Sequence, residues 1–243
     1  MSSVSIIIIT LNEEKKIGRL LSDLTKQTHQ KFEIIVVDSN SDDSTCETAL
    51  TFQDDLPKLT VHKMDTTGVS LGRNTGAVLA KYERILFLDA DVCLSPDFLS
   101  KSLSLLDEKK LEVAGIYMGS KGLPTAHKLG YGLFNVGLFV TQFIFPTAVG
   151  ACLFSTQRAH RDLQGFDEKI TLCEDCDYVK RASQTWRFRF LPMTFQFDPR
   201  RLDQEGLFKI GFTYLKANVR RFFFGEMRNN EMEYKFDHYS EQK

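Results

Sequence analysis

Three continuous apolar runs constrain the fold of this chain more than any other feature of its sequence. They stand in "SVSIIIIT", "FEIIVVD" and "RILFLDA", and their composition is typical of strands buried on both faces of a sheet. Amphipathic segments separate them, and in the first of these Ile17, Leu20 and Leu24 share one helical face. Strands that alternate with helices predict an α/β domain with a mostly parallel central sheet and helices on both faces.

The remaining segments extend this pattern. Apolar runs in "LTVHKM", "LEVAGIYM" and "GACLFST" predict further strands, and "SLGRNTGAVLA", "SPDFLSKSLSLL" and "EDCDYVKRAS" predict helices. Side-chain caps are expected at two helix starts. Asn12 would cap the first helix, and Ser44 with Glu47 would form a capping box for the second.

Composition narrows the class of protein. The chain has 243 residues, 42% of them hydrophobic, which is enough for one sizeable domain or for one domain with a small appendage. Its 31 Lys and Arg balance its 32 Asp and Glu, which argues against a general nucleic-acid binder. The opening "MSSVSIIIITLNEE" lacks the basic segment and cleavage site of a signal peptide, and the five cysteines are irregularly spaced. We therefore expect a reducing, cytoplasmic compartment.

Polar residues follow the predicted strands directly. Thr10 ends the first strand, Asp38 ends the second, and Asp89 and Asp91 follow the fourth. In sheets of this kind ligands bind beyond the carboxyl ends of the strands. These four residues therefore predict a binding site at one edge of the sheet.

The pair of Asp89 and Asp91 suits a hard divalent cation. Mg²⁺ or Mn²⁺ prefers oxygen ligands, and Mg²⁺ typically takes one or two carboxylates together with substrate phosphates. A bound cation would also offset the repulsion between the two acids. By itself, however, an Asp-x-Asp pair is common by chance, and two solvated acids at the start of a loop are then the favoured explanation.

Further residues widen the range of chemistry. The sequence has neither a Walker-type nor a Rossmann-type glycine-rich phosphate loop. Asp38 is placed to accept a hydrogen bond from a base or ribose, and Arg73, in "GVSLGRNTGA", can neutralise phosphate. Glu174 and Asp175 stand at the start of a predicted helix, where a carboxylate can act as a general base. The helix N-terminus is expected to favour its ionised form.

Taken in order, these stretches resemble a known family. The chain is similar to inverting, nucleotide-sugar-dependent family 2 glycosyltransferases of the GT-A (Rossmann-like) fold. The resemblance covers roughly residues 3–182 and rests on "SIIIITLNEE", "EIIVVDSNSDDST", "GRNTGA", "ILFLDADV", "GACLFSTQRAHRDLQGFDE" and "EDCDYVKRA". Each stretch alone is modest support, whereas the ordered set is specific.

The resemblance implies roles on the donor side. Thr10 and Glu13 would border the nucleotide base, and Asp38 would contact a uracil or its equivalent. Arg73 would lie near the diphosphate, and Glu174 would belong to the nucleotide-sugar site. Many relatives have "DDGS" or "DGGS" where this chain has "DSNS", a departure that keeps the aspartate but changes the residues beside the ribose.

It also implies a metal site and a base. Asp89 and Asp91 would hold Mg²⁺ or Mn²⁺, with Asp91 the more direct ligand, and Asp175 would take the proton from the acceptor hydroxyl. Asp198 is the candidate for a third metal ligand. Arg200 and Arg201 would hold phosphate, with an ordinary exposed basic pair as an equal alternative.

The chain is expected to divide into two parts. Residues 1–200 would form the GT-A domain, with nucleotide-sugar binding in 1–120 and the acceptor and catalytic part in 121–200. Residues 201–243 would form an amphipathic helix and a polar tail. The uncharged stretch from Leu129 to Phe145 predicts a helix that touches membrane or lipid, and the alternative is a helix buried against the sheet or a partner subunit.

We therefore expect a metal-dependent, inverting glycosyltransferase of the hexosyltransferase type, active in cell-envelope polysaccharide biosynthesis. Its donor would be a UDP-sugar, with GDP- and dTDP-sugars as alternatives, and its acceptor a glycan or a lipid-linked hydroxyl. It would work in the cytoplasm or at the inner face of the cytoplasmic membrane, alone or as a homo-oligomer. The alternatives are a nucleotidyltransferase acting on sugar phosphates and a catalytically silent relative that binds nucleotide-sugars.

Overall fold

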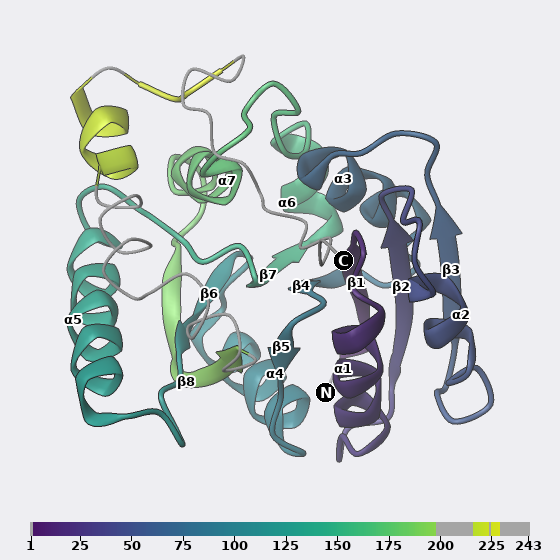
Figure 1. Ribbon diagram of the computed structural model, residues 1–243. Coiled ribbons are helices and arrows are strands. Elements are labelled where there is room, and N and C mark those ends of the chain that lie inside the picture. The colour runs from purple at the N-terminus through teal and green to yellow at the C-terminus, as the bar shows by residue number, and fades with distance from the viewer. Residues whose placement is uncertain (1, 198–215, 224, 229–243) are drawn as a thin grey trace, which may run out of the picture.

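The structure, a computed structural model, describes residues 2–197, 216–223 and 225–228 (Figure 1). Within these residues eight strands form one sheet in the order β3-β2-β1-β4-β7-β6-β8-β5. The strands are β1 (Val4–Thr10), β2 (Phe32–Asp38), β3 (Leu59–Lys63), β4 (Arg84–Asp89), β5 (Val92–Cys93), β6 (Ala114–Met118), β7 (Cys152–Thr156) and β8 (Arg189–Phe197). The helices are α1 (Glu14–Thr25), α2 (Thr45–Leu50), α3 (Val69–Leu79), α4 (Phe98–Lys109), α5 (Thr125–Thr141), α6 (Gln157–Asp162) and α7 (Glu174–Ala182), with a further short helix over residues 216–223.

The N-terminal half of the sheet is parallel, as predicted. β1 lies between β2 and β4, and β3 pairs with β2. In this register Thr10 stands opposite Asp38, and Ile9 stands opposite Asp89. The carboxyl ends of β1, β2 and β4 therefore meet at one edge of the sheet.

The other half is mixed. β7 runs antiparallel between β4 and β6, β8 is parallel to β6, and β5 pairs antiparallel with the end of β8. Because β7 runs against β4, the segment that enters β7 lies beside the carboxyl end of β4. The backbone N–H of Asp89 donates to the carbonyl of Ala151 at 3.1 Å. This strand brings a distant part of the chain to the edge where Asp89 stands.

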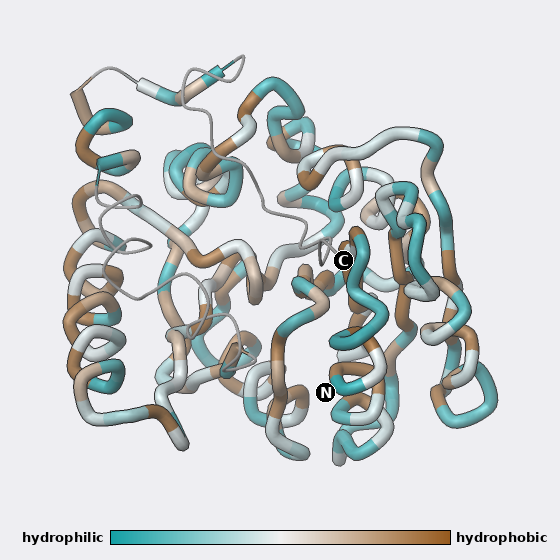
Figure 2. The backbone as a smooth tube through the Cα atoms, viewed as in Figure 1, coloured by the Kyte–Doolittle hydropathy of each residue, from teal (hydrophilic) through white to brown (hydrophobic). Residues whose placement is uncertain are grey.

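Helices cover both faces of the sheet, as predicted. Alternate residues of β1 explain why: Ile6 and Ile8 pack into one apolar core with α1 and α4, whereas Ile7 packs into a second core with α3 and α7. The apolar colour of the central strands in Figure 2 follows from this two-sided burial.

The predicted caps are wrong. The residue before α1 is Glu13, and Asn12 has a positive φ of 53° and accepts a hydrogen bond from the N–H of Asp42 instead. Ser44 makes no side-chain cap on α2. The start of α2 instead bonds the backbone at the start of α1, where Thr45 Oγ1 accepts a hydrogen bond from the N–H of Glu13 at 2.8 Å. Contacts between the two loops therefore replace the local caps.

The apolar stretch from Leu129 forms most of α5, which stands at the left edge of the view in Figure 1. Within the described residues, none of the helices combines the length and apolar character that crossing a bilayer requires. Of the expected C-terminal part, only residues 216–223 and 225–228 are described, and Ala217 packs there in a small core with Leu172 and Cys176. The boundary near residue 200 stays a prediction.

The contact between α3 and β1 gives a test of this packing. A Cβ atom at Gly76 would lie 2.3 Å from Cγ2 of Ile7, so we expect Gly76→Ala to lower the free energy of unfolding by about 1–3 kcal/mol. Gly137 in α5 is the matched control, because a Cβ there meets nothing within 4 Å. Gly137→Ala should raise that free energy by about 0.5–1 kcal/mol. Urea denaturation followed by circular dichroism measures both, and equal effects would contradict the packing.

Candidate active site

Asp38 organises the loop that follows β2. Its side chain is buried, and Oδ1 accepts hydrogen bonds from Thr10 Oγ1 at 2.8 Å and from Ser41 Oγ at 2.5 Å. Oδ2 accepts from the N–H of Ser41 at 2.8 Å. Both carboxylate oxygens thus hold the loop, and the predicted contact of Asp38 with a base stays a prediction.

Glu13 lies close enough to the end of β4 to sense its acids. Burial raises the pKa of Glu13, and the charges of Asp91 and Asp89 add to this, while Lys16 opposes it. Lys16 Nζ stands 3.0 Å from Glu13 Oε2. Glu13, which follows β1, therefore shares this edge of the sheet with Asp89 and Asp91 at the end of β4. The parallel pairing of β1 and β4 places the two strand ends side by side.

Arg73 is buried among acids rather than exposed. Its Nη1 donates to Glu174 Oε1 at 2.6 Å, and its Nη2 donates to Asp89 Oδ1 at 3.1 Å and to the carbonyl of Gly150 at 3.2 Å. Although burial opposes its charge, Glu174, Asp89 and Asp175 raise the pKa of Arg73 above its ordinary value. We call Arg73, Asp89, Glu174 and the Gly150 carbonyl the Arg73 network. It joins α3, β4, the entry to β7 and α7.

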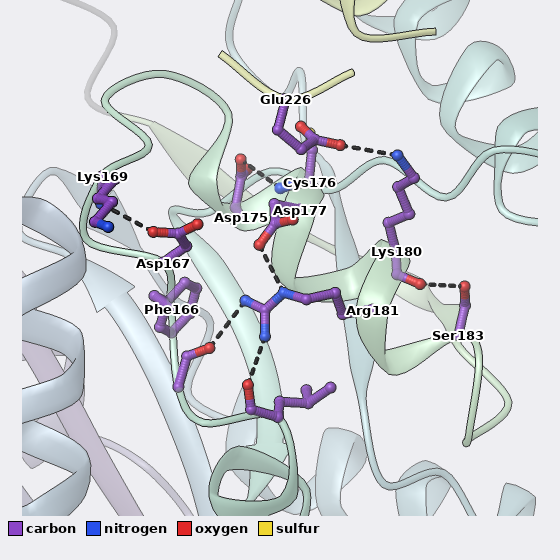
Figure 3. A network of polar contacts seen from close by, with 12 residues as sticks. Phe166, Asp167, Lys169, Asp175, Cys176, Asp177, Lys180, Arg181, Ser183 and Glu226 are labelled. Carbon is purple, nitrogen blue, oxygen red and sulfur yellow. Dashed lines mark hydrogen bonds and ion pairs between the residues drawn. The ribbon is translucent and has the colours of Figure 1, made fainter. Parts of the chain in front are cut away.

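Asp175 is the second residue of α7 and is also buried. Its Oδ1 accepts the N–H of Cys176 at 2.8 Å (Figure 3). Burial and then the charge of Glu174 raise the pKa of Asp175 to about 6, against the opposing effect of Arg73. Desolvation therefore outweighs the preference for the ionised form that was expected from the helix N-terminus. A carboxylate with this pKa is suited to act as a base near neutral pH.

Gly150 is a site residue that sequence reasoning missed. A Cβ atom there would lie 2.9 Å from Arg73 Nη2 and 3.0 Å from Asp175 Cβ. Only glycine lets these two side chains close on the backbone entering β7. The one available signal was a glycine at the start of the strand "GACLFST".

The residues fit a divalent cation in part. Asp91 is buried and stands two residues after the last residue of β4. Carboxylates are among the oxygen ligands that Mg²⁺ and Mn²⁺ prefer. Asp89 also faces this edge, but its Oδ1 is engaged by Arg73. In the described ranges no three His, Cys, Asp or Glu residues gather as a metal site. Asp198, Arg200 and Arg201 lie outside the described residues. A cation here would have to complete its shell with water and phosphate, as Mg²⁺ commonly does.

Comparison with known proteins decides the family. The family model "Glycosyl transferase family 2" matches residues 5–162, a span that holds the sheet edge with Asp38, Arg73, Asp89 and Asp91. The chain belongs to this family. The predicted resemblance is confirmed.

Curated relatives match part of the sequence of this family 2 chain. The poly(ribitol-phosphate) β-N-acetylglucosaminyltransferase TarS of Staphylococcus aureus is 33% identical over 131 residues, which is 51% of this chain and 23% of that protein. The UDP-Glc:α-D-GlcNAc-diphosphoundecaprenol β-1,3-glucosyltransferase WfgD of Escherichia coli is 33% identical over 103 residues, 42% of this chain and 40% of that protein. The chain therefore spans less than half the length of these two relatives.

Solved structures agree on the fold. TarS residues 1–349 in complex with UDP-GlcNAc superpose with a TM-score of 0.65 at 23% identity, covering 80% of this chain and 58% of that one. The mannosyltransferase PcManGT of Pyrobaculum calidifontis, in complex with GDP-Man and Mn²⁺, superposes with a TM-score of 0.69 at 20% identity, covering 80% and 56%. The family 2 chain thus has the GT-A fold that the sequence predicted.

A double-mutant cycle tests the Arg73 network. Arg73→Met leaves Glu174 and Asp89 without their cation, and we expect the free energy of unfolding to fall by about 3 kcal/mol. Adding Glu174→Gln should recover part of this loss, a coupling of about 1–3 kcal/mol. The control is Arg158→Met, which removes an exposed ion pair with Asp162 and should change stability by no more than about 1 kcal/mol. Additive effects of the two network substitutions in urea denaturation would reject the network.

Proposed function

We propose that this chain transfers a sugar from a nucleotide-diphosphate donor to a hydroxyl acceptor, with inversion at the anomeric carbon. The observation that carries the proposal is Asp175, a buried acid with a pKa of about 6, whose neighbour Glu174 is joined through Arg73 to Asp89 at the end of β4. Family membership favours this reaction over nucleotidyl transfer. The names of WfgD and the TarS complex contain UDP-sugars, which supports a UDP-sugar as the first donor to test.

The donor would lie across the carboxyl ends of β1, β2 and β4. Thr10, Glu13 and the loop held by Asp38 would border the nucleotide, and Asp89 would face the diphosphate. Arg73, already paired with Asp89 and Glu174, would act by fixing these acids and by offsetting negative charge close to the phosphates.

A divalent cation would be held by Asp91, with Asp89 beside it. When bound, Mg²⁺ or Mn²⁺ supplies charge stabilisation to the departing diphosphate. The presence of Mn²⁺ in the PcManGT complex supports testing this ion first. Glu13 would add negative charge on the other side of the same edge.

Asp175 would act as the base. Its carboxylate would take the proton from the acceptor hydroxyl while that oxygen forms a bond to the anomeric carbon and the bond to the diphosphate oxygen breaks. Attack from the face opposite the nucleotide gives inversion. Glu174, its neighbour, is held by Arg73 and by its charge keeps the pKa of Asp175 high. The two adjacent acids would thus have different roles.

The acceptor we propose is a glycan or lipid-linked hydroxyl of the cell envelope. TarS and WfgD are named for poly(ribitol-phosphate) and for a diphosphoundecaprenol acceptor, respectively. The uncharged, outward-facing residues of α5 lie in the part of the chain expected to receive the acceptor. Both points support an acceptor with an apolar carrier.

Replacement of Asp175 tests the base. Asp175→Asn removes the proton acceptor with little change in shape, so we expect turnover to fall by about 10²–10⁴-fold while donor affinity stays similar. In the wild type, kcat/KM should rise with pH up to about 6 and then level, because the protonated acid below its pKa accepts no proton. Asp177→Asn is the matched control on the same helix, since Asp177 pairs with Arg181 at 2.7 Å. Turnover of Asp175→Asn equal to that of the control would reject this role.

Metal dependence has its own test. We expect Mn²⁺ to raise the melting temperature in the presence of a UDP-sugar, because a ligand that binds only the folded state stabilises it. Asp91→Ala should reduce this metal-dependent shift by most of its size. A shift of unchanged size in Asp91→Ala would reject the ligand role. A flat response of the wild type to UDP-, GDP- and dTDP-sugars would contradict the proposed donor site.

A further inference from the structure

α5 presents the reverse of an ordinary surface helix. Two polar side chains of its C-terminal half point inward: Asn135 exchanges hydrogen bonds of 3.1 and 2.8 Å with the backbone of Met118, and Gln142, directly after the helix, accepts the N–H of Phe190 at 3.0 Å. Tyr131 and Leu138 are buried on the same side. The inner side is thus already anchored to the sheet.

The outer side of α5 is apolar. We call its exposed stripe, with the two residues that continue it past the helix end, the α5 surface: Leu129, Leu133, Val136, Val140, Phe143 and Ile144. Leu129 and Ile144, at its two ends, are each 77% exposed. A contiguous exposed apolar stripe normally marks a surface that contacts another protein or a membrane. Brown segments recur along α5 at the edge of the molecule in Figure 2.

The helix over residues 216–223 extends this surface. Phe222 and Phe223 are exposed there, and the ring of Phe222 meets that of Phe145 edge-on with the centroids 5.4 Å apart. In Figure 1 this helix lies directly above α5 at the same edge of the molecule. Two segments distant in sequence therefore form one apolar strip.

The charges next to α5 in sequence have one sign. The sequence contains no acid between Glu112 and Asp162, a stretch that includes all of α5. Exposed Lys121 and Lys128 stand at the start of α5. At its other end, Arg189 lies over the ring of Phe143, 4.5 Å from the centroid. A strip of apolar side chains with cations at its ends is complementary to anionic lipid headgroups above acyl chains.

Acids close to the second helix do not reverse this charge pattern. Among the described residues, Glu226 is the carboxylate that contacts this helix, and its oxygens are engaged by Arg221 at 2.5 Å and Lys180 at 3.0 Å. These two cations lower the pKa of Glu226 against the effect of burial, so it stays ionised and compensated. In the part of the chain that the structure describes, the charge balance around the strip is therefore basic.

We propose that the α5 surface, extended by Phe222 and Phe223, docks on an anionic phospholipid bilayer. α5 has 17 residues and is bonded to the sheet along its inner side, so it lies along the membrane interface. Only residues 142–149 separate its C-terminal end from the Gly150 carbonyl of the Arg73 network. Docking would therefore bring the candidate active site close to headgroup level, where the hydroxyl of a lipid-linked acceptor is presented. The link to the acceptor rests on the proposed glycosyl transfer, whereas docking itself does not.

Flotation of the full chain with vesicles tests docking. We expect it to float with phosphatidylglycerol–phosphatidylcholine vesicles and to float far less with phosphatidylcholine vesicles. The difference between the two should grow as the salt concentration is lowered. Leu133→Ser combined with Ile144→Ser should reduce binding about tenfold or more, because two exposed apolar anchors are lost. Lys128→Glu should weaken binding to the anionic vesicles specifically.

Val78→Ser is the matched control, because Val78 is an apolar residue 86% exposed in α3, outside the strip. It should float like the wild type. Asp175→Asn should also float like the wild type, so loss of transfer with retained flotation separates failure of the proposed reaction from failure of docking.

Three results would overturn the proposal. One is the absence of flotation with anionic vesicles. Another is a dimer in light scattering that the Leu133→Ser and Ile144→Ser pair dissociates, which would make the strip an interface between copies of this chain. The third is a large fall in melting temperature in that pair, since this would mean that the chain's own residues cover the strip.

Discussion

The structure of the candidate site depends on one buried charge. Arg73 lies in the interior of the fold, and a buried guanidinium is tolerated only when ionised partners and hydrogen-bond acceptors surround it. Asp89, Glu174 and the carbonyl of Gly150 supply these. The same contacts hold the end of β4, the entry to β7 and the start of α7 against α3. The network that compensates Arg73 is therefore also the network that positions Asp175.

This arrangement explains how the buried strand β4 can end in two acids, Asp89 and Asp91. Asp89 shares the charge of Arg73, and Asp91 lies buried behind it, where a cation would offset its charge. Asp175 receives less compensation: its pKa of about 6 reflects burial beside Glu174, with Arg73 opposing in part. A single cation among several acids thus leaves the pKa of Asp175 poised near neutrality, which acid–base chemistry requires.

The α5 surface and the C-terminal part of the candidate site, which comprises Gly150, Glu174 and Asp175, belong to the same half of the fold. α5 joins β6 to β7, and β7 is the strand whose entry carries Gly150. The hydrogen bonds of Asn135 and Gln142 explain why α5 can turn its apolar side outward: its few polar side chains complete the backbone bonding of β6 and β8. A docked α5 would couple the position of the bilayer to that of the active-site edge.

The sequence by itself determined the parallel strands, their helices and the edge at which Thr10, Asp38 and Asp89 meet, because buried apolar runs and parallel register are local consequences of composition and alternation. It also predicted Asp175 as the candidate base and the membership of family 2. Only the tertiary structure decided that β7 runs against β4, that Gly150 admits two side chains, and that the caps come from neighbouring loops. It likewise decided the pKa of Asp175 and the outward apolar face of α5. Each of these depends on which distant groups come together, since burial and charge compensation are properties of the assembled interior.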